Sequence, residues 1–114
     1  MKVRIYQIVP ELDVNHLMFR NLQTILSKSN GKIPEAIYEC VYEGELEAKQ
    51  LEDVFYILNC DFPQDYHARS LSVSDVVEMV KSDNDSSFYF CDSFGFQPFP
   101  FNKSAVHKNQ EEKK

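Results

Sequence analysis

The densest cluster of reactive side chains in this sequence is Asp65-Tyr66-His67-Ala68-Arg69-Ser70. Within it, Asp65 could orient His67, whose imidazole can accept a proton near neutral pH. A small hydrolase or nuclease would use four of these side chains, namely Asp65, His67, Arg69 and Ser70. The alternative is a polar loop in which the serine and aspartate side chains hydrogen-bond to backbone groups.

The serines and glycines bear on this choice. Ser70, Ser72 and Ser74 alternate along the chain, so on a strand their hydroxyls would share one face. However, the sequence has no Gly-x-Ser-x-Gly elbow, and its three glycines are isolated, which argues against a phosphate-binding loop. We therefore favour the polar loop and predict that the chain has no catalytic residue and is not an enzyme.

Side chains that bind metals or act as nucleophiles are scattered along the chain. The histidines show no His-x-x-x-His spacing and are His16, His67 and His107. The cysteines show no Cys-x-x-Cys spacing and are Cys40, Cys60 and Cys91. This spacing predicts no metal and no cofactor. It also indicates reduced cysteines that pack as buried apolar side chains, without disulfides or a catalytic thiol.

Aromatic side chains gather near the C-terminus. Residues 88–101 contain seven of the fifteen aromatic side chains of the chain. Pro98 and Pro100 lack ladder donors, so the last part of this segment cannot be a regular central strand. Two interpretations stay open: the last phenylalanines are exposed and form a docking patch, or they fold back and cap the core.

Acidic side chains dominate the middle of the chain. Residues 33–92 carry fourteen acidic and three basic side chains, and the whole chain has a net charge of −6. This balance disfavours direct nucleic-acid binding, which needs Lys and Arg at the phosphates. It suits a partner protein with a basic surface, including a nucleic-acid-binding protein. The simpler interpretation is an acidic face that confers solubility.

These features together predict a partner-binding surface of acidic, loop and aromatic residues. Its members are Glu43, Glu45, Glu47, His67, Arg69, Phe96, Phe99 and Phe101.

Hydrophobic periodicity predicts the elements that must position these residues. Strands are expected at residues 2–9 and 36–43, and in the second strand Tyr38, Cys40 and Tyr42 share one face. The first helix is expected to begin at an N-cap, Asp13, and to bury Val14, Met18, Leu22 and Ile25. The second helix is expected to bury Leu51, Val54, Phe55 and Leu58 and to end near residue 59.

The segment 72–80 fits either a strand or a helix. Its β-branched residues favour a strand that forms a hairpin with residues 88–92. A short strand is possible within residues 96–101, and the polar residues 102–114 are expected to be a disordered tail.

The elements predict an α+β fold in which two helices pack on one face of a small, mainly antiparallel sheet. A single domain should span residues 1–101, ahead of the tail at 102–114. The expected core is Ile5, Met18, Leu22, Val41, Phe55, Leu58, Val73, Val77 and Phe90. The chain has no apolar run long enough for a bilayer and no signal-peptide pattern, so we expect a cytoplasmic protein.

Four segments also resemble one protein family. They are Ser70-Leu71-Ser72-Val73-Ser74-Asp75-Val76-Val77, Tyr89-Phe90-Cys91-Asp92-Ser93-Phe94-Gly95-Phe96, Tyr42-Glu43-Gly44-Glu45-Leu46 and Leu51-Glu52-Asp53-Val54-Phe55. In these residues the chain resembles the YodL-like domain of Firmicutes over about residues 3–101. The resemblance implies a small bacterial protein or module of conjugative elements, plasmids and phages, with no enzymatic activity.

The predicted function is therefore that of a non-enzymatic inhibitor or regulator that binds a host protein. The sharpest form of this hypothesis is an anti-defence protein of the anti-CRISPR type, carried by a mobile element. The alternative is the small hydrolase or nuclease built on Asp65, His67, Arg69 and Ser70. Replacing His67 and Arg69 with Ala separates the two, because an enzyme would lose turnover and a binder would lose only affinity.

Overall fold

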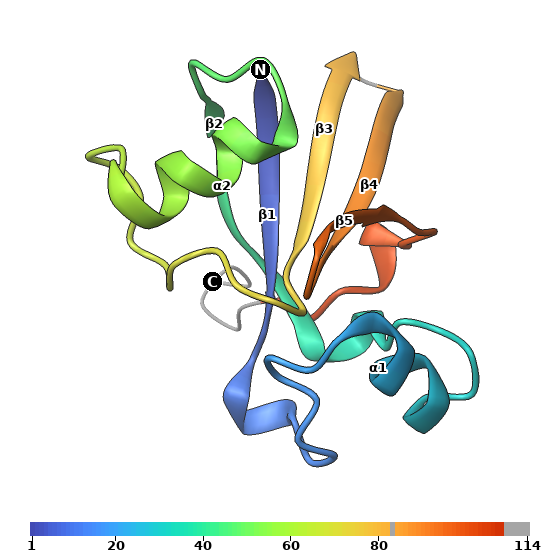
Figure 1. The fold of residues 1–114 in the computed structure, drawn as a ribbon. Coiled ribbons are helices and arrows are strands. Elements are labelled where there is room, and N and C mark those ends of the chain that lie inside the picture. The colour runs from blue at the N-terminus through green and yellow to red at the C-terminus, as the bar shows by residue number, and fades with distance from the viewer. Residues whose placement is uncertain (83, 109–114) are drawn as a thin grey trace.

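The computed structural model describes residues 1–82 and 84–108. Its centre is an antiparallel sheet of five strands in the order β2-β1-β3-β4-β5 (Figure 1). The strands are β1 (Lys2–Ile8), β2 (Tyr38–Glu45), β3 (Val76–Ser82), β4 (Asp85–Asp92) and β5 (Gly95–Pro98). The α-helices are α1 (Leu22–Lys28) and α2 (Leu51–Cys60), and short 3-10 turns occupy Pro10–Leu12, Glu35–Ile37 and Lys103–Ala105. The α+β prediction is confirmed at this level.

The segment 72–80, which fitted either a strand or a helix, contains the start of strand β3. Val76 and Val77 begin a strand that pairs with β1 on one side and with β4 on the other. β-branched side chains pack well on such a pleated, two-sided surface, which explains the choice of strand over helix. Strand β5 also forms within the aromatic segment, and it ends at Pro98.

The first predicted helix forms only in its second half. The carboxylate of Asp13 accepts hydrogen bonds from the amides of Leu17 (2.7 Å) and Met18 (2.9 Å) and so closes a loop instead of starting a helix. His16 and Phe19 have positive φ values of 56° and 70°, which an α-helix excludes. Helix α1 begins only after Asn21, whose side chain accepts a hydrogen bond from the amide of Thr24.

The buried side chains form two clusters. The first joins α2 to the sheet through Val3, Ile5, Tyr42, Leu46, Val54, Leu58, Tyr66, Leu71 and Val77. The second joins α1 and the C-terminal segment to the sheet through Tyr6, Ile8, Leu17, Ile25, Ile33, Tyr38, Val76, Phe90 and Phe101. Val76 and Val77 are adjacent on one strand, so the clusters lie on opposite faces. The prediction that both helices pack on one face is therefore not confirmed.

Strand β2 contains a bulge, and the bulge changes which of its side chains point to each face of the sheet. Ile5 pairs with Tyr42 and Tyr6 pairs with Cys40, so Val41 is an extra residue without a partner. As a result Tyr38 and Tyr42 belong to different clusters. The prediction that they share one face was wrong because simple alternation does not hold across a bulge.

The predicted core is partly correct. Ile5, Leu58, Val77 and Phe90 are buried, and Met18, Leu22, Val41 and Val73 are partly buried. Phe55 was wrongly assigned to the core, because 42% of its surface is exposed. The residues of α2 that are buried against the sheet are Val54 and Leu58.

The packed part of the chain continues past Phe101. The Lys103 ammonium lies 3.0 Å from the Glu78 carboxylate, and the amide of His107 donates to the carbonyl of Tyr38 at 2.8 Å. Residues 109–114 of the expected tail lie outside the described residues. Within the part of the chain that the structure describes, no helix is long and apolar enough to cross a membrane.

Candidate functional site

The reactive cluster at residues 65–70 forms a loop packed beside the sheet. The hydroxyl of Tyr42 donates to Asp65 at 3.4 Å, and the guanidinium of Arg69 donates to the carbonyl of Ile8 at 3.0 Å. His67 is exposed, and no hydrogen bond joins it to Asp65 or Ser70 within the described residues. The geometry is that of a polar loop tied to the sheet.

The three serines do not share a strand face. Ser72 donates from its hydroxyl to the carbonyl of Ser70 at 3.0 Å, whereas the buried hydroxyl of Ser74 accepts from the amide of Phe19 at 3.0 Å. The alternation argument was wrong because β3 begins only at Val76. Upstream of it, Ser74 has a positive φ of 87°, so the chain turns there.

Two buried carboxylates follow these serines in the sequence. Asp75 is 1% exposed, and Glu78 is 0% exposed. Neither residue was among the predicted site residues. The available signal was an acidic side chain in the middle of an apolar strand, where it must find a buried partner.

The pKa values of these two carboxyls move in opposite directions. Burial raises the pKa of Asp75 to about 7, although the Ser72 amide and the Gln7 side chain hydrogen-bond to it. Burial also raises the pKa of Glu78, but hydrogen bonds from Ser86, Tyr6, Lys103 and Arg4 outweigh it, and its pKa lies below the ordinary value. Both groups serve the packing of the sheet, since neither is accessible to a substrate.

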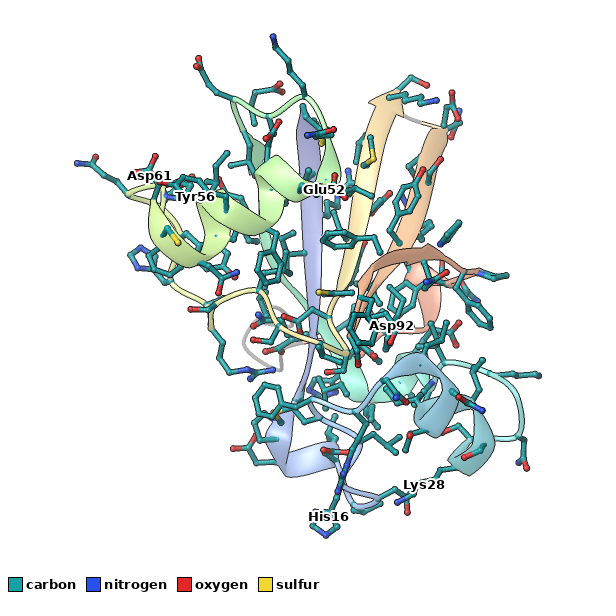
Figure 2. All side chains as sticks on the ribbon, viewed as in Figure 1. His16, Lys28, Glu52, Tyr56, Asp61 and Asp92 are labelled. Carbon is teal, nitrogen blue, oxygen red and sulfur yellow. The ribbon has the colours of Figure 1, made fainter. Side chains whose placement is uncertain are left out.

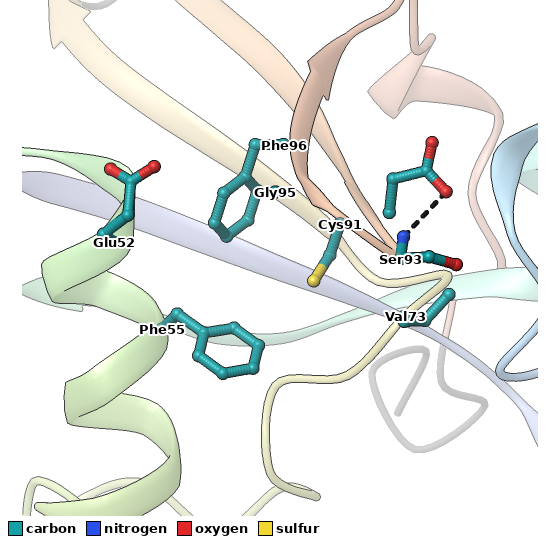
Figure 3. A pocket seen from close by; sticks show the side chains of 8 residues that line it. Glu52, Phe55, Val73, Cys91, Ser93, Gly95 and Phe96 are labelled. Carbon is teal, nitrogen blue, oxygen red and sulfur yellow. Dashed lines mark hydrogen bonds between the residues drawn. The ribbon is translucent and has the colours of Figure 1, made fainter.

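An open groove lies between α2 and the β4–β5 hairpin. Its volume is about 340 Å³, and its apolar lining comes from Phe55 of α2, Val73, Cys91 of β4 and Phe96 of β5. In Figure 3 the rings of Phe55 and Phe96 project into the groove from opposite walls, with Cys91 between them. Exposed apolar side chains gathered around a concave surface are typical of a binding site.

The rim of the groove is acidic. Glu52 of α2 and Asp92 at the end of β4 line it, together with Ser93 and Gly95 (Figures 2 and 3). The Asp92 carboxylate accepts from the amides of Leu22 (3.2 Å) and Ser93 (2.9 Å), which ties the start of α1 to this hairpin. Among the described residues, the lining includes two carboxylates and no basic side chain.

The architecture that holds this groove can be compared with known proteins. The family model of the YodL-like domain matches residues 2–101. The chain belongs to the YodL-like domain family. No curated protein and no solved structure matches it.

The predicted partner-binding residues of this YodL-like domain lie in separate places. Glu43 pairs with Lys2 at 3.3 Å and Arg4 at 3.4 Å on the edge strand β2, and Glu45 accepts from the α-amino group of Met1 at 2.7 Å. Glu47 follows in the loop before α2, and it is exposed. These acids therefore flank the edge of the sheet opposite to β5.

The predicted aromatic binding residues also lie in different places. Phe96 lines the groove, and Phe99 is half-buried beside a shallower hollow at Pro98 and Pro100. Phe101 is 7% exposed and packs against Tyr6 and Tyr38 at centroid distances of 5.0 and 5.4 Å. For Phe101, the interpretation that it folds back onto the core holds, so it is not available for docking.

The sequence predicted that the cysteines of this YodL-like domain are buried, and this holds for one of the three. Cys40 and Cys60 are exposed, and only Cys91 is buried. Burial raises the pKa of Cys91 to about 12, so this thiol is protonated at neutral pH and is a poor nucleophile. Within residues 1–82 and 84–108, no group of three or more His, Cys, Asp or Glu side chains is arranged to hold a metal ion.

Proposed function

We propose that this YodL-like domain is a non-enzymatic binding protein that inhibits or regulates a partner protein with a basic surface. The observation that carries this proposal is the open apolar groove between α2 and β5, with acidic side chains on its rim. A groove of this composition favours capture of an apolar side chain from a positively charged surface.

The charge distribution supports the same proposal. Asp75 and Glu78 are buried, but most of the other acidic side chains of residues 33–92 lie at the surface. The negative field of these side chains steers a basic partner toward the domain and accelerates association at low salt. The predicted acidic residues Glu43, Glu45 and Glu47 contribute to this field rather than to the groove.

The finer form of the proposal concerns the partner. A domain carried by a bacterial mobile element would act in the host cytoplasm, on a protein whose basic surface normally faces nucleic acid. An anti-defence inhibitor of the anti-CRISPR type fits this description, because an acidic surface can occupy a nucleic-acid site. The support is the acidic surface of a small domain and the family to which it belongs.

The alternative is the small hydrolase or nuclease based on Asp65, His67, Arg69 and Ser70. The geometry gives this alternative less support. In the described part of the chain His67 has no hydrogen bond to Asp65 or Ser70. The guanidinium of Arg69 donates to the carbonyl of Ile8 in the sheet. The binding proposal needs none of these side chains.

Affinity capture from a Firmicute lysate, followed by binding measurements on the purified partner, tests the proposal. The expected partner is a basic protein whose affinity for the domain falls between low and physiological salt, and His67→Ala should at most lower that affinity. The proposal is wrong if the purified domain degrades a nucleic acid or peptide catalytically and His67→Ala abolishes the reaction.

A further inference from the structure

We infer that the groove between α2 and β5 binds a bulky apolar side chain flanked by Lys or Arg on the partner, while Phe94 packs against the partner next to it. This inference rests on the proposed function, because it names the feature of the partner that the binding domain recognises. It also separates the groove from the acidic edge of β2, which takes no part in this contact.

The apolar part of the inference follows from the walls of the groove. Phe55 is 42% exposed although it lies on the same helix as the buried Val54 and Leu58. Phe96 faces it from β5, and Cys91 and Val73 complete the apolar lining (Figure 3). Burying these surfaces under a partner side chain removes apolar area from water, which is the main favourable term in association.

The inference that Lys or Arg flanks the bound side chain follows from the acidic rim of the groove. Glu52 is an exposed side chain on the first turn of α2 and lines the groove there (Figures 2 and 3). Asp92 also lines the groove, at the end of β4, but its carboxylate is bonded to the amide of Leu22 at the start of α1. An apolar side chain that enters the groove beside Glu52 brings its sequence neighbours close to this carboxylate. Lys or Arg at those neighbouring positions would complement the rim, whereas Asp or Glu would be repelled.

Phe94 supplies a second anchor next to the groove. It is 96% exposed at the β4–β5 turn, between the lining residues Ser93 and Gly95. Gly95 has a positive φ of 89°, a conformation that glycine adopts without strain, so the turn presents Phe94 outward. An exposed aromatic side chain next to an apolar groove resembles the aromatic anchors that dominate the binding energy of protein interfaces.

Charge also distinguishes the partner from a second copy of this chain. A symmetric dimer through this surface would place Phe94 of each copy near the groove of the other. It would also bring the Glu52 carboxylates of the two copies toward each other, in a chain with a net charge of −6. Repulsion between these like charges disfavours that dimer and favours a basic partner.

The test is an NMR titration of the ¹⁵N-labelled full chain with three capped hexapeptides. They are Lys-Lys-Leu-Phe-Lys-Lys, its acidic counterpart Glu-Glu-Leu-Phe-Glu-Glu, and Lys-Lys-Ala-Ala-Lys-Lys. Only the first should shift the amide resonances of Phe55, Val73 and Phe96 in a saturable manner. Phe55→Ser should weaken that binding about tenfold, and Glu52→Lys about fivefold.

Matched controls come from the same part of the chain. Tyr56→Ser alters an exposed aromatic residue of α2 that does not line the groove, and Gln64→Lys adds a lysine in the loop after α2 without removing a carboxylate. Each should change the affinity less than about twofold. Because Phe55 and Glu52 are exposed, circular dichroism should show that their variants remain folded.

Three results would overturn the inference. The first is equal binding of the acidic peptide, or no saturable shift with the basic apolar peptide. The second is a set of shifts confined to the β2 edge around Glu43 and Glu45, which would leave the proposed basic partner intact but exclude the groove. The third is groove shifts that depend on protein concentration alone and vanish in Phe94→Ser, which would identify a second copy as the occupant. Failure of the proposed function appears separately, as the absence of a basic partner in affinity capture.

Discussion

Asp75 and Glu78 lie three residues apart and are both buried, but they differ in the groups that contact their carboxyls. Cations contact Glu78, whereas neutral groups donate to Asp75. The Glu78 carboxylate accepts from the hydroxyl of Tyr6 at 2.7 Å, and it pairs with the guanidinium of Arg4 at 3.1 Å and the ammonium of Lys103 at 3.0 Å. Its pKa falls below the ordinary value. A buried carboxylate with two cations stays charged and connects β1, β3 and the C-terminal segment.

Within the described part of the chain, the hydrogen-bond donors to the Asp75 carboxyl are neutral. Its Oδ2 accepts from the side chain of Gln7 at 3.0 Å and the amide of Ser72 at 2.9 Å, and its Oδ1 has no hydrogen-bond partner within the described residues. The cation that influences it is Arg69, whose guanidinium is bonded to the carbonyl of Ile8. Tyr38, Tyr66 and Cys91 also face Asp75, and its negative charge contributes to their raised pKa values.

The comparison teaches that burial alone does not determine the charge of a carboxyl group. Desolvation disfavours the charged form of both residues, and the number of cations within reach decides the outcome. Glu78 therefore contributes a charged connection between strands, whereas burial shifts Asp75 toward its protonated form. Three experiments test this difference, from the largest expected effect to the smallest.

Glu78→Gln should have the largest effect. The substitution keeps the size of the side chain but leaves Arg4 and Lys103 without their buried carboxylate. Breaking a buried ion pair in this way costs about 3–5 kcal/mol of unfolding free energy. Urea denaturation at neutral pH measures it, and a loss below about 1 kcal/mol would show that the charge of Glu78 is not needed.

Asp75→Asn should alter the pH dependence of stability. The folded pKa of Asp75 is raised from 3.8 to about 7, so the folded state binds more protons than the unfolded state between these values. The wild-type domain should therefore lose about 2–4 kcal/mol of unfolding free energy as the pH rises through this window. The Asn variant, which carries no charge at either pH, should be nearly independent of pH there.

Urea midpoints at the two ends of that window measure the effect. The folded pKa of Glu78 is below 4.5, so its stabilising contribution is present above that pH and is lost only as the pH falls further. The two carboxyls thus act in different pH ranges and with opposite signs. A wild-type domain that becomes more stable on the way to neutral pH would contradict the assignment to Asp75.

Lys103→Met should have the smallest effect on stability. The side chain of Lys103 is 42% exposed, so its pair with Glu78 is screened by water and Arg4 still holds the carboxylate. We expect a loss of about 1 kcal/mol or less. The more sensitive readout is hydrogen exchange at the amide of His107, which bonds to Tyr38 and should exchange faster when the segment is released. Unchanged exchange would show that Lys103 does not hold this segment.

Much of the fold was predictable because its signals are local. The β-branched run of β3 and its hairpin with β4 were predicted, and so was α2, whose expected stripe includes the buried Val54 and Leu58. The site was less predictable. Phe96 was named as a binding residue and lines the groove, but Phe55 was assigned to the core and Glu52 and Phe94 were not singled out.

The sequence by itself determined where strands and helices can form, because periodicity and turn residues act over a few positions. It also determined the acidic character of residues 33–92 and the family of the chain. Only the tertiary structure determined which faces of the strands and helices are buried. The bulge at Val41 and the return of Phe101 to the core depend on contacts with distant residues. The late start of α1 does too, because the amides of Phe19 and Leu22 bond to Ser74 and Asp92. For the same reason, only the fold could place two cations against Glu78 and, among the described residues, give Asp75 neutral donors while Arg69 bonds to Ile8.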